Sequence, residues 1–138
     1  MTLKIIGFNG FGDVEGPGCP KATKNIALNL KNRQRCIDTA DYGPANPRLA
    51  NDGYWKRMAD RWRISMSDAK SMRCGNCAAF EITKRIKDCI ASGIGRDGIE
   101  PYDTIVAGEL GYCRFFDFKC AASRTCAAWV VGGPIKDK

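Results

Sequence analysis

Apolar residues at helical spacing mark one segment of the chain clearly. Trp55, Met58, Ala59 and Trp62 lie at positions i, i+3, i+4 and i+7, which is the stripe that one face of an amphipathic helix presents. Tryptophans on such a stripe pack into a core or against a docking partner. The pattern therefore predicts a helix around residues 51–62 with a core or docking function for its tryptophans.

Two further helices are predicted around the cysteine-rich part of the chain. Ser65 and Asp68 have the spacing of a capping box and predict a short helix that continues to Met72. Residues 80–90 carry apolar side chains at a partly helical period and end at a glycine-rich stretch. That segment is predicted to form another short helix.

The rest of the chain predicts less regular structure. Residues 3–8 form a plausible short strand before a glycine-rich stretch, and residues 21–37 leave a short helix and an extended segment both open. Two prolines make residues 42–47 an ordered turn or extended connector. Residues 102–107 are predicted to form a strand, and compact irregular structure around a site is expected from Gly108 onward.

These elements predict a small α+β protein that is irregular and rich in cysteine. We expect an N-terminal arm and connector over residues 1–50, with the arm extended, followed over residues 51–138 by a helix and a cysteine-rich domain. A chain of 138 residues can bury one modest core but not two full ones.

Charge and hydropathy exclude some classes of partner. The opening residues Met1–Phe8 are too short an apolar run for a signal peptide or a spanning helix, so we expect neither secretion by that route nor membrane insertion. The net charge of +7 comes from 22 basic and 15 acidic residues that are scattered singly or in pairs. Scattered charge is typical of a solvated surface, so nucleic acid is not expected as a partner.

The chain contains no histidine, which excludes Ser-His-Asp and Cys-His catalysis and every mixed Cys/His zinc site. Residues 93–98 match G-x-G-x-x-G, but that motif needs a following helix, which we expect Pro101 to block, so the segment is predicted to be a loop. We find no paired carboxylates that suggest acid–base chemistry. The sequence therefore predicts a protein that is not an enzyme.

Eight cysteines are the strongest chemical signal in the chain. Cys74 and Cys77 form a C-x-x-C pair, a spacing that presents two sulfurs to one metal or cluster. A thioredoxin-type pair would need a βαβ context that is missing here. A four-cysteine zinc site, which would favour a second C-x-x-C, and a framework of three disulfides stay open beside an iron–sulfur cluster.

Three segments resemble, in order, the cluster-binding segments of high-potential iron–sulfur proteins. They are Arg73–Phe80, Gly111–Phe116 and Cys126–Val130. The resemblance implies a [4Fe-4S] cluster. The implied cluster ligands are Cys74, Cys77, Cys113 and Cys126, and the implied aromatic shell that excludes water is Phe80, Phe115, Phe116 and Trp129.

The chain departs from that family in two respects. The stretch between Cys77 and Cys113 is longer than the family's, and Cys89 and Cys120 are additional. The two extra cysteines could pair as a disulfide, stay as buried thiols or displace Cys113 as ligand, and Cys120 is the stronger rival. The fates of Cys19 and Cys36 in the arm are also left open.

A second resemblance covers nearly the whole chain. The chain is similar to small proteins encoded by tailed bacteriophages, especially those of marine and cyanobacterial hosts. The matching segments are Tyr42–Pro47, the Trp55 and Trp62 helix, Arg73–Phe80, Gly111–Cys113, Asp117–Cys120 and Arg124–Ile135. The resemblance implies a phage protein that is made in the host cytoplasm and carried in the virion.

Together these observations predict a structural virion protein whose fold is stabilised by a [4Fe-4S] cluster. Other virion proteins would bind through the N-terminal arm and the Trp55/Trp62 helix. A soluble high-potential electron carrier and a structural module that binds zinc through four cysteines are the alternatives.

Overall fold

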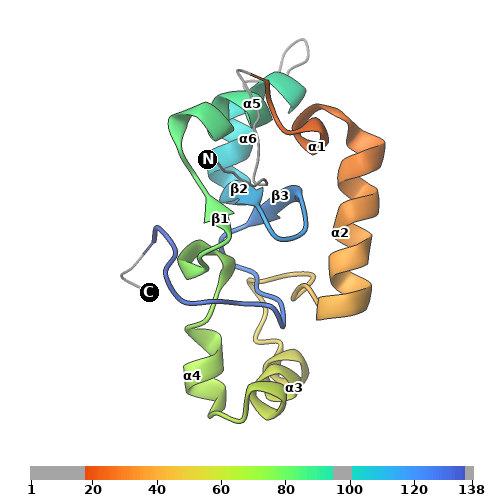
Figure 1. Cartoon of the computed structure of the whole chain (residues 1–138). Coiled ribbons are helices and arrows are strands. Elements are labelled where there is room, and N and C mark those ends of the chain that lie inside the picture. The colour runs from red at the N-terminus through yellow and green to blue at the C-terminus, as the bar shows by residue number, and fades with distance from the viewer. Residues whose placement is uncertain (1–17, 95–100, 136–138) are drawn as a thin grey trace, which may run out of the picture.

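The computed structural model describes residues 18–94 and 101–135. Within these residues the chain forms six helices and one antiparallel sheet of three strands, so the predicted α+β class is confirmed (Figure 1). The helices are α1 (Lys21–Lys24), α2 (Ile26–Ala40), α3 (Asp52–Trp62), α4 (Met66–Lys70), α5 (Lys84–Ile94) and α6 (Pro101–Gly108). The strands are β1 (Phe80–Glu81), β2 (Leu110–Cys113) and β3 (Phe118–Ala121).

The sheet separates two groups of buried side chains. Its order is β1-β2-β3, with Phe80 opposite Cys113, Cys113 opposite Phe118, and Gly111 opposite Cys120. Because directly opposed residues share a face of the sheet, one face carries both cysteines and both phenylalanines. Gly111 lies on this face too. No larger residue fits there, because a Cβ would come within 2.3 Å of the Phe80 ring.

Residues 18–40 were expected to belong to an extended arm, and this expectation is wrong. They form α1 and α2, and α2 packs beside the sheet (Figure 1). The Asn32 side chain donates to the Asp117 carbonyl at 2.7 Å, and the Lys119 amide donates to the Asn29 side chain at 2.8 Å. These bonds hold α2 against β3 and the turn before it. The strand predicted over residues 3–8 lies outside the described residues.

Helices α1 and α5 pack closely against one another near the opposite face of the sheet. Gly93 permits this approach, since a Cβ there would lie 1.7 Å from the Thr23 carbonyl oxygen. Cys89, one turn earlier on α5, forms a disulfide with Cys19. Tyr112 of β2 is buried with Ile86 of α5 in this part of the core.

The predicted tryptophan helix is confirmed as α3. Its apolar stripe packs against α4 in a separate buried cluster that contains Trp55, Met58 and Ala69. The Ser65 hydroxyl accepts a hydrogen bond from the Asp68 amide at 3.0 Å, as the predicted cap requires, although α4 ends at Lys70 before the predicted Met72. The core interpretation of the tryptophans is therefore confirmed for Trp55, which is only 2% exposed.

Two predicted elements after residue 80 differ from the structure. Residues 102–107, predicted as a strand, lie within helix α6. Their β-branched and aromatic residues suggested a strand, but Pro101 is tolerated at the first helical position, where its missing amide is not needed. The helix predicted over residues 80–90 is shifted, because Phe80 and Glu81 pair with β2 and α5 starts only at Lys84. The predicted loop over residues 93–98 is described only to Ile94, which still belongs to α5.

The part of the chain after Cys126 wraps around the C-x-x-C segment. The Gly133 amide donates to the Asn76 carbonyl at 3.0 Å, and the Ile135 amide donates to the Gly75 carbonyl at 2.9 Å. A Cβ at Gly133 would lie 2.4 Å from the backbone nitrogen of Cys77. Among the described helices, none has the length and apolar character needed to cross a membrane.

Candidate metal centre

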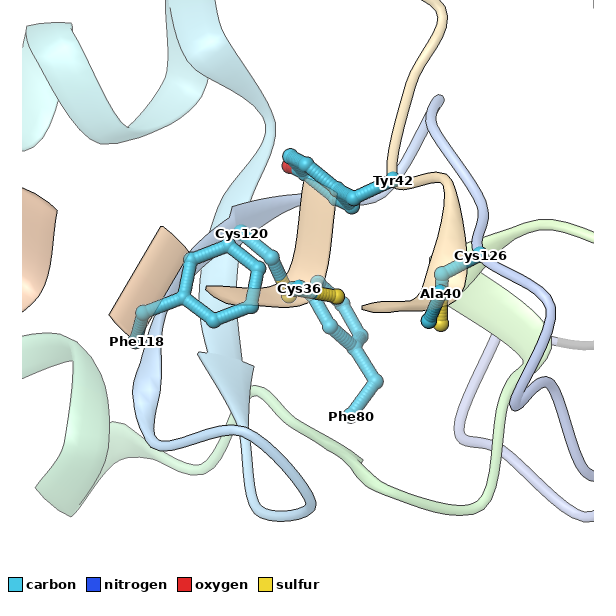
Figure 2. Close-up of a cluster of buried hydrophobic side chains, with 7 residues drawn as sticks. All are labelled: Cys36, Ala40, Tyr42, Phe80, Phe118, Cys120 and Cys126. Atoms are coloured by element: carbon cyan, nitrogen blue, oxygen red, sulfur yellow. The ribbon is translucent and has the colours of Figure 1, made fainter. Parts of the chain in front are cut away.

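Six of the eight cysteines are free thiols, and they gather in one part of the core. Cys36, Cys120 and Cys126 belong to a buried cluster that also contains Tyr42, Phe80 and Phe118 (Figure 2). Cys74 and Cys113 are partly buried and pack against it. The cluster therefore brings together α2, both longer strands, the C-x-x-C segment and the segment after β3. We call it the cysteine core.

The C-x-x-C segment forms a tight turn that neighbouring segments hold in place. Residues Cys74–Asn76 form one turn of 3-10 helix, closed by a bond from the Cys77 amide to the Cys74 carbonyl at 2.9 Å. The Cys74 amide donates to the Arg124 carbonyl at 2.6 Å. Asn76 Oδ1 accepts from the Arg73 amide at 3.0 Å and from Trp129 Nε1 at 2.8 Å. The turn is thus positioned from both sides before any ligand is considered.

The free thiols lie close enough to shift the pKa of one another. Cys126 is the first cause that raises the pKa of Cys36, and Cys113 and Cys74 add to the effect of burial in raising the pKa of Cys120. Burial is the main cause that raises the pKa of Cys77, and the charges of Cys74 and Cys113 add to it.

Backbone amides donate to three of the four sulfurs that the sequence implied as ligands. Cys77 accepts from the amides of Ala79 and Val130, Cys113 from those of Phe115 and Phe116, and Cys126 from that of Ala128. Such bonds stabilise a thiolate. Amide-to-sulfur hydrogen bonding is also one of the factors that set the properties of iron–sulfur clusters.

The acidities of the thiols separate them into two groups. The pKa of Cys113 is lowered, first by its bond with Cys120 and then by the two amides, and the pKa of Cys126 is lowered by its bond with Cys36 and by one amide. The bond with Cys126 and burial raise the pKa of Cys36, and burial is the main cause that raises the pKa of Cys120. For Cys77, burial outweighs the amide bonds and raises the pKa.

The aromatic residues implied as a shell differ in position. Phe80 is buried in the cysteine core, and Phe116 is partly buried against it. Phe115 is 51% exposed and so covers the sulfurs little. Trp129 lies beside the C-x-x-C turn, where its Nε1 also donates to the Arg73 carbonyl at 3.0 Å.

Two aromatic residues of the core were missed from the sequence. Tyr42 and Phe118 pack edge to face with ring centroids 5.0 Å apart, and the Tyr42 hydroxyl accepts from the Ala121 amide at 3.1 Å. In Figure 2, Tyr42 and Phe80 lie on opposite sides of the Cys36 sulfur. The spacing of Phe118 and Cys120, two apart on one strand, was a usable signal, whereas Tyr42 comes from a connector without any period.

The structure also shows where the remaining cysteines lie. Cys89 is bonded to Cys19, so it does not pair with Cys120 as one open alternative had it. Cys36, assigned from the sequence to the arm, lies in the cysteine core instead. Cys113 and Cys120 are both present in the core, and their amide bonding distinguishes them.

Among the described residues, no group of three or more His, Cys, Asp or Glu side chains is arranged to hold a metal ion. Zinc would need four sulfurs at about 2.3 Å from one point. In a [4Fe-4S] cluster each cysteine binds a different iron, so the sulfurs stand around a larger body. An all-thiol set with amide donors and apolar walls is compatible with that chemistry.

The chain is thus a small α+β protein in which five free thiols lie in or against one buried cluster. Comparison with protein-family models, curated proteins and solved structures gave no significant match of any of the three kinds.

Proposed function

We propose that this protein binds a [4Fe-4S] cluster through Cys74, Cys77, Cys113 and Cys126, and that the cluster stabilises its fold. The observation that carries the proposal is the gathering of Cys74, Cys113 and Cys126 in one apolar cluster, with Cys74 and Cys77 on a single tight turn. Bound thiolates keep a negative charge in an apolar core, and amide donors offset the cost of burying that charge.

The directions of the pKa shifts favour Cys113 over Cys120 as a ligand. The contact with Cys120 lowers the pKa of Cys113, whereas burial is the main cause that raises the pKa of Cys120. The pKa of Cys36 is also raised, first by its contact with Cys126 and then by burial. We assign Cys36 and Cys120 as neutral thiols beside the cluster.

A structural contribution follows from where the cluster would lie. The cysteine core is the contact region of α2, the sheet and the segment after Cys126. Ligand bonds that join these parts exist only in the folded state, so the free energy of cluster binding is also folding free energy. The alternative of a soluble electron carrier uses the same ligands and differs in whether the cluster exchanges electrons reversibly.

We further propose that the protein is a virion component of a tailed phage, as its resemblance to phage-encoded proteins implies. Contact with other virion proteins through α3 would use the side away from Trp55, because that side chain is buried within this protein. Helix α2, which lies in the segment predicted as the arm, exposes Ile26 and Leu30. Mass spectrometry of purified phage particles tests this part, and absence of the protein from the particles would refute it.

Anaerobic purification tests the cluster itself. The expected protein is brown and contains iron and acid-labile sulfide in equal amounts, with four of each per chain for one [4Fe-4S] cluster. A colourless protein with stoichiometric zinc would refute the assignment.

Matched variants test the ligand set. Cys126→Ala is expected to lose iron and sulfide and to unfold the region around the C-x-x-C turn, whereas Cys120→Ala should retain both. The reverse result would make Cys120 a ligand. If Cys126→Ala folds normally and only the reduction potential changes, the electron-carrier function is favoured over the structural one.

A further inference from the structure

Cys36 and Cys126 are two thiols from distant parts of the chain that lie in one buried cluster, the cysteine core. The Ala127 amide donates to the Ala40 carbonyl at 2.6 Å, which fixes the segment after β3 against the end of α2. Cys36 lies one turn before Ala40 on the same face of that helix. The two cysteines are therefore brought together by the backbone (Figure 2).

We propose that Cys36 and Cys126 form a disulfide when no cluster is bound, and that this disulfide prevents the cluster from being loaded. The second half rests on the proposed function, because Cys126 is one of the four assigned ligands. When the Cys126 sulfur is joined to Cys36 in a disulfide, it is not a thiolate and cannot bind iron. The pair would make cluster assembly dependent on the redox state of the surroundings.

The reaction needs a low-molecular-weight disulfide as oxidant, of which oxidised glutathione is the example we choose. The Cys126 sulfur attacks one sulfur of glutathione disulfide, which forms a mixed disulfide and releases one glutathione thiol. The Cys36 sulfur then attacks the Cys126 sulfur of that mixed disulfide and releases the second glutathione. Two cysteine thiols are oxidised, one glutathione disulfide is reduced, and the two cysteine protons end on the two glutathione thiols.

The backbone favours this pair over the other thiols of the core. The bond between Ala127 and Ala40 holds Cys126 beside the end of α2, and Cys36 enters the cysteine core from that same helix. Disulfide formation requires the two sulfurs to come to about 2.05 Å from one another. The chain already carries one disulfide between remote residues, Cys19–Cys89.

Peptide mapping of the oxidised protein tests the first half. Full-length protein freed of metal is incubated with oxidised glutathione, the remaining thiols are alkylated, and the digest is analysed without reduction. We expect a peptide that joins Cys36 to Cys126, in addition to the Cys19–Cys89 peptide. If Cys126 is recovered alkylated, or joined to Cys113 or Cys120, the proposal is overturned.

Reconstitution with ferrous iron and sulfide tests the second half. Oxidised wild-type protein should fail to acquire the absorbance of the cluster, and prior treatment with dithiothreitol should restore it. Cys36→Ala, oxidised in the same way, should retain one glutathione on Cys126, because the thiol that resolves the mixed disulfide is missing, whereas Cys120→Ala should behave as the wild type does. Loading of oxidised wild-type protein in which the Cys36–Cys126 peptide has been mapped would refute the blocking function.

The two proposals can fail separately. Reduced wild-type protein that takes up no iron and sulfide would refute the proposed function and with it the blocking of loading, while the peptide map would still decide whether Cys36 and Cys126 pair. Reduced protein that loads normally but never forms this disulfide would refute only the inference made here.

Discussion

Gly133 is a position where a single methyl group should separate the C-terminal segment from the C-x-x-C turn. In Gly133→Ala the new Cβ would lie 2.3 Å from the Asn76 carbonyl carbon and 2.4 Å from the nitrogen and oxygen of Cys77. Ordinary contact begins at 3.4 Å, so the segments must part by 1.1 Å (3.4 minus 2.3). The neighbouring atoms are backbone, which cannot rotate out of the way.

The cost follows from the bonds that this separation strains. The Gly133 and Ile135 amides donate to the turn at 3.0 and 2.9 Å, and each such bond contributes about 1 kcal/mol. Overpacking adds about 1–3 kcal/mol. We therefore expect the free energy of unfolding to fall by about 3 kcal/mol, which corresponds to a decrease in Tm of about 10 °C for a chain of this size.

Urea denaturation followed by circular dichroism measures the loss, with Gly53→Ala as the control. Gly53 lies in α3, and a Cβ there would have no neighbour within 4 Å. Alanine should instead stabilise that helix by about 0.5–1 kcal/mol. If Gly133→Ala unfolds at the same urea concentration as the wild type, the close packing of the segment on the turn is wrong.

Three other predictions address the disulfide, the turn and the pH dependence. Cys89→Ser removes a disulfide between residues 70 positions apart and should lower the free energy of unfolding by about 4 kcal/mol. Dithiothreitol should make the wild type and the variant unfold alike, and a difference that persists would count against the disulfide. Asn76→Ala removes the hydrogen bonds that its side chain makes with Arg73, Ser71 and Trp129 and should cost about 2–3 kcal/mol, measured by tryptophan fluorescence in urea, with an unchanged midpoint as the contrary result. Burial raises the pKa of Asp117 in the folded protein above its ordinary value of 3.8. The charged carboxylate therefore destabilises the folded state at pH values above the raised pKa, and this effect disappears below pH 3.8. Asp117→Asn should be more stable than the wild type at neutral pH but not in acid, and a gain that persists in acid would contradict this cause.

How much of the fold the sequence predicts depends on whether a buried face is made of large apolar side chains. The stripe of α3 carries Trp55 and Met58, and the helix was predicted correctly. On α2 the buried residues are Asn32, Cys36 and Ala40, while Ile26 and Leu30 are 59% and 56% exposed. The apolar residues of this segment therefore do not mark the buried face of the helix. For this reason the sequence could not distinguish a helix from an extended segment over residues 21–37.

The candidate site shows the same division between local and remote signals. Cys74 and Cys77 were found because their spacing is a local motif, and their turn is where it was expected. Cys36 carries no motif, and its place beside Cys126 results from tertiary packing of α2 against a segment far along the chain. Such a contact has no signature in the residues on either side of it.

The packing of Cys36 against Cys126 also constrains the order in which the protein can fold. The two residues are 90 positions apart (126 minus 36), and contacts between such remote residues form slowly because a long loop must close first. During synthesis, α2 leaves the ribosome well before the segment that covers it. A nascent chain therefore exposes the thiol of Cys36 until nearly all of the described residues have been made, and this is the interval in which a chaperone or an assembly partner would have access to it.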